Sequence, residues 1–342
     1  MPTITSVTRA LRLEGQQLVV FLLIIVLAAF FSFLTPSFLS DRSLDNVFRT
    51  ASMYGIVAVG MTLVIITAGI DLSVASLMAF AGALGAGLLG TAFGAANPVH
   101  LPITAALMIA LLSTTVLGLM NGTLIAKLNL APFVVTLGMM SVARGLTFLA
   151  GNFVVRKTSG TAITFTDPSF DWLGAGTLGP IPSQTALFIV IAIAAAVVLR
   201  YTHFGRSLFA VGGNIEDARL AGIRTARVLV AVYAIAGLLA GLSGLILTGR
   251  LSSAAPLAAT GYELNVIMIV VIGGTSLVGG RGSILGTVLG AILISEIDTG
   301  MNLLNVPSFN QFLIKGTLLV LAVVVDKLYQ RRGLRALRLT TA

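Results

Sequence analysis

Residues 52–90 read SMYGIVAVGMTLVIITAGIDLSVASLMAFAGALGAGLLG, and Asp71 is the only charged residue among them. A helix needs about 20 apolar residues to cross a hydrocarbon layer of about 30 Å. The stretch is therefore long enough for two crossings, and Asp71 beside Gly69 marks the division between them. We expect two membrane helices here, over residues 52–70 and 72–90.

Apolar runs of this kind occur along the whole chain of 342 residues. The chain is 57% hydrophobic and 10% charged with a mean hydropathy of +1.03, whereas soluble domains carry roughly 25% charged residues. The composition predicts an all-α integral membrane protein with about ten transmembrane helices. The other eight runs cover residues 18–34, 102–126, 132–150, 183–201, 227–248, 263–280, 283–304 and 309–326. The first run is long for a signal peptide and offers no small-residue cleavage site, so we expect it to be retained.

Basic residues indicate how the chain is oriented. With the N-terminus in the cytoplasm, 14 of the 21 Lys and Arg residues fall in cytoplasmic segments and five in outer segments. This excess follows the positive-inside rule, so we expect both termini in the cytoplasm. Two loops are long, residues 151–182 on the outer side and residues 202–226 on the cytoplasmic side. The rest is short connections, which predicts one membrane domain over residues 1–342.

Several kinds of chemistry have no motif in this sequence. There is no Walker A loop, no HExxH and no nucleophile elbow. Cysteine is absent and only His100 and His203 could offer imidazole, so we expect no metal and no cofactor. The net charge of +9 is scattered between apolar runs and forms no basic stripe, which argues against nucleic acid. We therefore expect a protein that is not an enzyme and that draws energy from a partner or from an ion gradient.

The cytoplasmic loop contains the sequence GRSLFAVGGNIEDARLAGI at residues 205–223. Asn214 is a favourable N-cap, Glu216 and Asp217 suit the positive end of a helix, and Gly222 suits a left-handed C-terminal stop. The pattern predicts a helix over residues 215–221. Two turns are too few for a helix to be stable alone in water, so it needs a surface to dock on. That surface is either a cytoplasmic partner or the membrane interface.

The chain resembles the permeases of ribose-type ABC importers, and the resemblance covers residues 18–326. The motifs that carry it are AVGMTLVIITAGIDLSV at residues 58–74, GYEL at 261–264, VIGGTSLVGG at 271–280 and ARLAGI at 218–223. Ala75 stands where the family usually has glycine. In this family the loop at 202–226 contains a short helix that sits in a cleft of the ATPase. The residues that the resemblance assigns to ATPase coupling are Gly205, Arg206, Gly212, Asn214, Glu216, Asp217, Ala218, Arg219, Gly222 and Ile223.

The resemblance also implies a set of partners. These are a second permease, either an identical copy or a paralogue, a cytoplasmic ABC ATPase with two nucleotide-binding domains, and a periplasmic sugar-binding protein. The implied function is import of a monosaccharide, ribose or a related sugar, across the bacterial inner membrane. Two alternatives stay open: a secondary sugar transporter or channel, and a permease of the same family for autoinducer-2, nucleosides or amino acids.

Charged residues within the apolar runs need a reason to be there, because each costs at least about 2.5–3.5 kcal/mol at mid-membrane. We expect Arg144 or Lys315 to pair with Glu296 or Asp298, either to fix helix register or to line an outer vestibule. Asp71 either caps the following helix or serves as a gate. Uncharged polar residues either line the sugar pathway or join helices. The candidates for the pathway or gate are Thr67, Asp71, Asn121, Arg144, Thr275, Ser276, Asn302 and Lys315.

Glycines at four-residue spacing predict close helix packing. The pairs are Gly118 with Gly122, Gly237 with Gly241, and Gly286 with Gly290. A weak internal similarity relates residues 52–90 to residues 263–304, each a helix pair with glycine at its turn. Transporters built from repeats place the pathway at the repeat interface.

Overall fold

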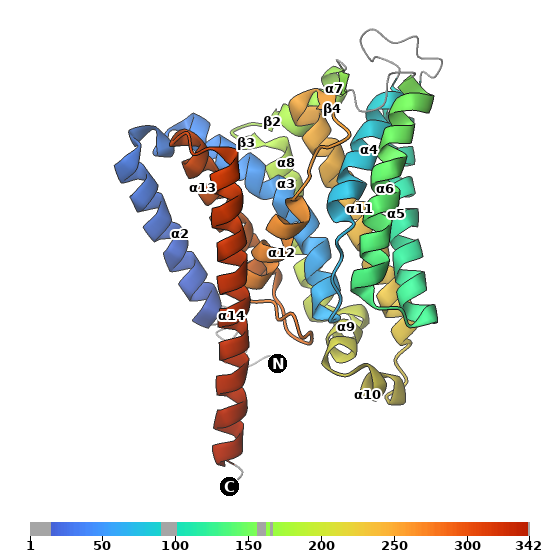
Figure 1. Cartoon of the computed structure of the whole chain (residues 1–342), viewed down its shortest axis with the longest axis vertical. Helices are drawn as coiled ribbons and strands as arrows, with labels where there is room; N and C mark the ends of the chain where they lie inside the picture. Colours follow the sequence, from blue (N-terminus) through green and yellow to red (C-terminus); the bar gives the residue numbers. More distant parts are fainter. Residues whose placement is uncertain (1–14, 90–100, 156–161, 165–166, 341–342) are drawn as a thin grey trace.

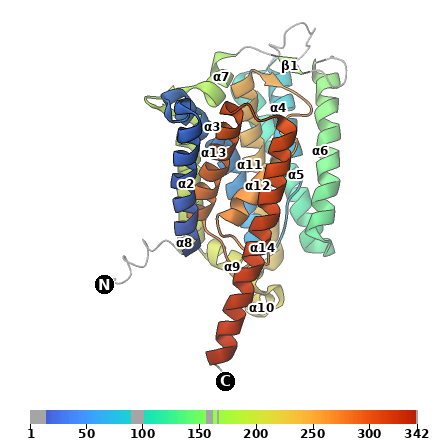
Figure 2. The same cartoon turned by 60° about the vertical axis from the view of Figure 1, so that its left-hand side comes forward.

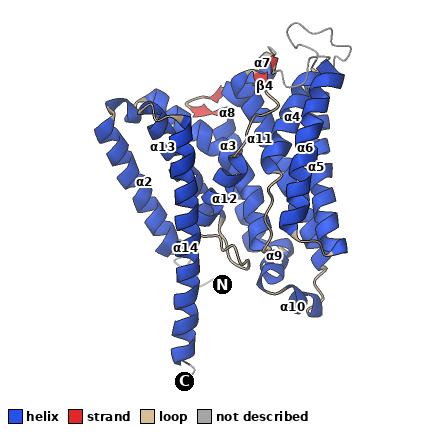
Figure 3. Cartoon of the chain, in the orientation of Figure 1, coloured by secondary structure: helices blue, strands red, loops and turns tan. Residues whose placement is uncertain are grey.

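The computed structural model describes residues 15–89, 101–155, 162–164 and 167–340, and the described chain is almost entirely helical (Figures 1 and 3). The long helices are α2 (Gly15–Leu34), α3 (Asp41–Ile66), α5 (Ile103–Leu128), α6 (Pro132–Val155), α8 (Ser183–Tyr201), α11 (Thr225–Leu251), α13 (Ile284–Leu303) and α14 (Ser308–Thr340). The shorter ones are η1 (Pro36–Leu39), α4 (Val74–Leu88), α7 (Pro168–Ala175), α9 (His203–Gly213), α10 (Ile215–Leu220) and α12 (Tyr262–Ile272).

Four two-residue strands complete the fold. Strand β1 (Ile163–Thr164) pairs antiparallel with β4 (Ser253–Ala254), and β2 (Thr177–Leu178) pairs antiparallel with β3 (Ile181–Pro182). Both pairs lie at the end of the helix bundle that carries α7, and α9 and α10 lie at the opposite end (Figures 1 and 2). The two long loops of the sequence therefore lie at opposite ends, which we call the α7 end and the α10 end.

The prediction of an all-α integral membrane protein is confirmed. Within the described residues, seven helices are long and apolar enough to cross a membrane, namely α2, α3, α5, α6, α8, α11 and α13. Three further apolar stretches of helix are shorter than 18 residues: α4, α12 and the apolar part of α14 over Ser308–Val324. Every one of the ten predicted runs thus contains a helix, but α4 and α12 are about 22 Å and 17 Å long, too short to cross alone.

Several predicted boundaries are wrong for identifiable reasons. Helix α3 begins at Asp41 instead of residue 52, because the Ser40 hydroxyl caps it and the charged residues of its first turns lie beyond the apolar run. Helix α12 ends at Ile272 instead of residue 280, because Gly274, two residues further on, adopts a positive φ of 97° that cannot continue an α-helix. Between α3 and α4 the chain is non-helical from Thr67 to Ser73, a gap of seven residues where we expected a division at one.

The core is centred on α3, which is buried from Ala51 to Ile66 and packs against α11, α12 and α13. The predicted glycine packing is confirmed. A Cβ on Gly118 of α5 would lie 2.3 Å from the Tyr233 carbonyl oxygen of α11, and one on Gly290 would lie 2.3 Å from the Ile269 carbonyl oxygen of α12. Helices meet at backbone distance at these points because no side chain stands between them.

Candidate functional site

Helix α10 forms where the sequence predicts it, over Ile215–Leu220. The Asn214 carbonyl Oδ1 accepts the backbone N–H groups of Glu216 at 3.0 Å and Asp217 at 3.4 Å, which confirms the N-cap. Gly222 has a positive φ of 81° and the Ile223 N–H donates to the Ala218 carbonyl at 3.0 Å, closing the C-terminus. The short helix is therefore fixed at both ends by its own sequence.

The outer surface of α10 carries an apolar residue that is mostly exposed in this chain. Leu220 is 86% exposed, whereas Ala218 is buried against the bundle. Arg219 and Glu216 form an exposed ion pair at 3.4 Å beside it. Leu220 and this ion pair give α10 an exposed surface of mixed apolar and charged character.

Helix α9 in the same loop was not predicted. The Thr202 hydroxyl caps it by accepting the Gly205 N–H at 3.2 Å, and Leu208 and Val211 are buried against the bundle. The signal was present in the sequence as a threonine followed by apolar residues at helical spacing. Gly205 packs directly on α8, since a Cβ there would lie 2.2 Å from the Leu199 carbonyl oxygen.

The ten predicted coupling residues therefore fall into two groups. Some face the bundle and fix α9 and α10 to it: Gly205, Gly212 and Ala218. The others cap α10, close it or face outward from the loop: Arg206, Asn214, Glu216, Asp217, Arg219, Gly222 and Ile223.

The non-helical segment 67–73 places a carboxylate inside the bundle. Asp71 is fully buried, and its Oδ1 accepts the Ser73 backbone N–H at 2.8 Å and the Ser73 hydroxyl at 2.5 Å. Asn121 of α5 donates to the same hydroxyl at 3.1 Å. Asp71 thus holds Ser73, the residue at the N-cap of α4, and does not itself cap the first turn of that helix.

The two cationic residues among the predicted pathway residues have different kinds of partner. Lys315 of α14 forms an ion pair with Asp298 of α13 at 2.8 Å, as expected. Of the two cations named in that expectation, Lys315 is therefore the one that pairs, and Arg144 forms no ion pair with Glu296 or Asp298. The Arg144 guanidinium on α6 donates to the backbone carbonyls of Pro256 and Ala258, the latter at 3.2 Å.

The carbonyls that Arg144 reaches belong to an irregular segment, residues 255–261, between β4 and α12. This segment runs from the α7 end into the middle of the bundle, where α12 begins (Figure 1). Ala259 and Gly261 both have positive φ, 58° and 85°. Arg144 therefore supplies side-chain donors to backbone that is neither helix nor sheet.

The remaining predicted pathway residues lie in structural positions. The Thr67 hydroxyl donates to the Val64 carbonyl at 2.7 Å at the end of α3. Asn302 of α13 accepts the Gln311 amide of α14 at 3.0 Å. Thr275 and Ser276 are buried in the turn between α12 and α13. The eight predicted residues do not form one site. Asp71 and Asn121 meet around Ser73, the turn with Thr275 and Ser276 packs near Ile66 and Ala68 on either side of Thr67, and Arg144, Asn302 and Lys315 make the separate contacts given above.

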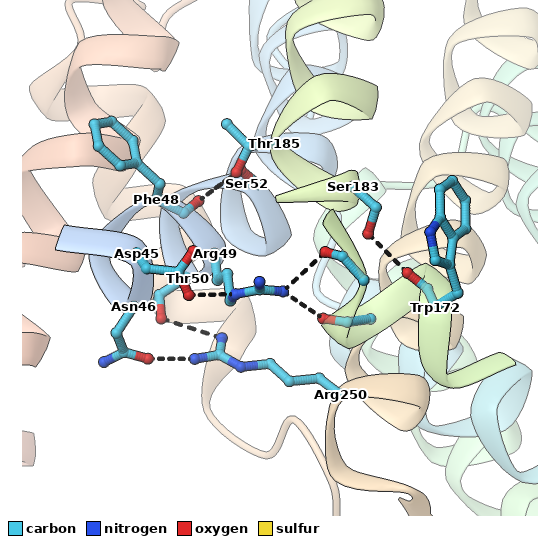
Figure 4. Close-up of polar contacts among 12 residues, drawn as sticks. Asp45, Asn46, Phe48, Arg49, Thr50, Ser52, Trp172, Ser183, Thr185 and Arg250 are labelled. Atoms are coloured by element: carbon cyan, nitrogen blue, oxygen red, sulfur yellow. Dashed lines mark hydrogen bonds and ion pairs between the residues drawn. The ribbon is translucent and has the colours of Figure 1, made fainter. Parts of the chain in front are cut away.

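A polar network at the α7 end, shown in Figure 4, was not predicted. Arg49 of α3 forms an ion pair with Asp45 at 2.7 Å and donates to the carbonyls of Gly174 and Gly176, at 3.4 Å each. Arg250 of α11 donates to Thr50 at 3.2 Å and to Asn46. Only the i,i+4 spacing of Asp45 and Arg49 could have indicated it. The network joins α7 to the end of α3, and the end of α3 to the end of α11.

Comparison with known proteins now defines the class. A model of the family described as the permease component of the branched-chain amino acid transport system matches residues 43–323. The chain belongs to this family of transport permeases, and it is a multi-pass protein of the bacterial inner membrane.

Individual relatives narrow the resemblance. The chain is 41% identical to the ribose import permease protein RbsC of Bacillus subtilis over 314 residues, covering 91% of this chain and 93% of the relative. It is 39% identical to RbsC of Escherichia coli K12 over 319 residues, covering 93% and 95%. It is 37% identical to the L-arabinose ABC transporter permease protein AraH of Azospirillum brasilense, covering 92% and 88%. No solved structure matches the chain. The resemblance to ribose-type ABC permeases is confirmed.

Proposed function

We propose that this chain is the membrane-spanning subunit of an ATP-driven importer for a monosaccharide, ribose or a closely related sugar. The observation that carries the proposal is α10, a helix capped at both ends that presents the exposed Leu220 beyond the bundle. A permease without its own nucleotide-binding motif needs a docking surface of this kind for a separate ATPase. The relatives named for ribose and L-arabinose support a sugar as the cargo over an amino acid.

The same proposal fixes orientation and partners. The α10 end faces the cytoplasm, with both termini there and with an ABC ATPase of two nucleotide-binding domains bound to it. The α7 end faces the periplasm and receives a sugar-binding protein on the platform formed by α7. The whole chain acts as one domain that crosses the membrane about ten times, with α4 and α12 as partial crossings completed by segments 67–73 and 255–261.

A second permease copy or a paralogue covers the face formed by segment 255–261 and α12. Irregular backbone within the membrane is tolerated only against protein or a water-filled path, because lipid offers its polar groups no hydrogen bonds. Leu257 in this segment is 68% exposed in the single chain. The sugar path then runs along this face between two permeases, with Arg144 holding the segment in place.

Reconstitution into proteoliposomes tests the proposal. The permease, its ATPase and its binding protein are combined, and uptake of labelled ribose is measured with L-arabinose and D-xylose as competitors. We expect uptake that requires ATP and all three components, and we expect unlabelled ribose, added as a third competitor, to reduce it more than L-arabinose or D-xylose does. Sugar flux by the permease alone, driven by an ion gradient, would overturn the importer assignment in favour of a secondary transporter.

A further inference from the structure

Three segments that are far apart in the sequence meet at the α10 end. They are the last turn of α3 at Ile66, the end of α9 at Gly212 and Gly213, and the turn between α12 and α13 at Gly279 and Gly280. The Gly280 N–H donates to the Ile66 carbonyl at 2.9 Å. We call these five residues the glycine junction. It links the two helix pairs whose sequences are weakly similar.

The contacts in the glycine junction are made by backbone atoms. A Cβ on Gly212 would lie 1.7 Å from the Ile66 carbonyl oxygen and 2.8 Å from the Gly280 nitrogen. A Cβ on Gly279 would lie 2.6 Å from the Gly212 carbonyl oxygen, and Gly279 and Gly280 both have positive φ. Backbone packed against backbone has no flexible side chain to absorb a displacement, so the three segments are mechanically joined.

One residue, Asn214, separates the glycine junction from α10. On the other side of the junction, α3 leads into segment 67–73 with the buried Asp71, and the α12–α13 turn leads into two core helices. The junction therefore gives a displacement of α10 a direct route to α3, α12 and α13.

The junction also has room to move. A cavity of about 360 Å³ lies between it and the turn that joins α5 to α6. Its lining includes Thr67, Gly69, Gly213, Asn129, Leu130 and Val278. Because this pocket opens to the surface and is not filled by side chains, it leaves the joined segments space to shift against the α5–α6 turn.

We propose that the glycine junction moves as one rigid body that transmits the movement of α10 to α3 and to the α12–α13 pair, with Gly212 as the positioning residue. The inference rests on the proposed function, since it assigns a path to the movement that the ATPase imposes. It goes further by naming the point at which that movement enters the membrane helices.

A pair of adjacent glycines gives a matched test. Gly212→Ala forces the junction apart, whereas Gly213→Ala meets no atom within 4 Å. In the reconstituted complex we expect Gly212→Ala to keep at least half of the ATP hydrolysis and to lower sugar uptake per ATP at least tenfold. Gly213→Ala stays within twofold of wild type in both. Unchanged uptake per ATP in Gly212→Ala would overturn the proposal.

A crosslink tests the rigid body directly and does not depend on whether Gly212→Ala folds. The chain has no cysteine, so a Gly213→Cys/Gly280→Cys pair introduces the only thiols. An ideal Cβ on Gly280 lies 3.2 Å from the Gly213 Cα, so the two positions are in direct contact. Gly280 has a positive φ of 70°, so the single Gly280→Cys variant is the reference for the strain that a side chain brings there. We expect the oxidised pair to retain uptake within twofold of its reduced form and of each single variant.

Loss of uptake on oxidation, restored by reductant, would show that the two segments separate during transport and would overturn the rigid-body proposal. Failure of the proposed function looks different, because the unmodified chain would then show no ATP-dependent uptake at all.

Discussion

The Lys315 ammonium lies 2.8 Å from the Asp298 carboxylate and joins α14 to α13, while the Tyr54 hydroxyl of α3 donates to the other Asp298 oxygen at 3.1 Å. Asn265 of α12 in turn donates to the Tyr54 hydroxyl at 3.2 Å. One carboxylate thus connects four helices through a buried network. Such a network is sensitive to the loss of one partner, since the charge left behind stays buried.

Lys315→Met removes the cation and leaves Asp298 unpaired. We expect the variant to lose about 3–5 kcal/mol of unfolding free energy, because an uncompensated buried charge is more costly than no charge. Thermal unfolding in detergent measures the loss. The double variant Lys315→Met/Asp298→Leu should recover much of the lost unfolding free energy. A double variant whose loss equals the sum of the losses in Lys315→Met and Asp298→Leu would contradict the coupling.

Leu220→Ala tests the surface that α10 offers to the ATPase. Burial of a leucine side chain contributes about 1.5–3 kcal/mol, so we expect the affinity for the ATPase to fall about tenfold or more. Leu178→Ala is the matched control, an exposed leucine at the α7 end. Binding of the purified ATPase to permease in nanodiscs measures both, and equal effects would argue against α10 as the docking helix.

Arg144→Leu removes the donors that hold segment 255–261. Because the Pro256 and Ala258 carbonyls lose their partner, we expect sugar uptake to fall more than the yield of assembled complex. Each unsatisfied buried acceptor costs about 1–3 kcal/mol. Arg144→Lys keeps the charge with fewer donors and should give intermediate uptake. Equal loss of uptake and assembly would assign Arg144 to the stability of the fold alone.

Asp71→Asn keeps an oxygen that can accept both hydrogen bonds from Ser73. If Asp71 serves only to position the start of α4, this variant should fold and transport like wild type, and Asp71→Leu should lose stability and transport together. Thermal unfolding and uptake measured on the same preparations separate the two effects. A stable but inactive Asp71→Asn would assign the carboxylate a part in gating.

The sequence allowed the membrane class, the long apolar helices and α10 to be predicted because each depends on local pattern. Length, apolar content and a cap at Asn214 are all visible in consecutive residues. The partial helices α4 and α12 were overestimated, because an apolar run does not distinguish a helix from irregular backbone that the rest of the bundle covers. Gly274, with its positive φ, ends α12 inside such a run.

Contacts between distant segments were the least predictable. Lys315 and Asp298 could be paired from their similar depth, but Arg144 could not be matched to Pro256 and Ala258 because its acceptors are backbone carbonyls that every residue has. The glycine junction was hidden for the same reason. Gly280 and Ile66 are joined by a main-chain hydrogen bond, and the glycine residues indicate only that another part of the backbone lies close by.

The non-helical segments at residues 67–73 and 255–261 do not fix the rotation of the helices that follow them in the way that helical residues do. A residue inserted within α12 would turn the rest of that helix by about 100° and move its buried side onto the surface. The same insertion between residues 255 and 261 would change the contacts of that segment with Arg144 but would leave the buried side of α12 where it is. A change in chain length within residues 67–73 or 255–261 therefore alters local contacts without rotating the helices that follow.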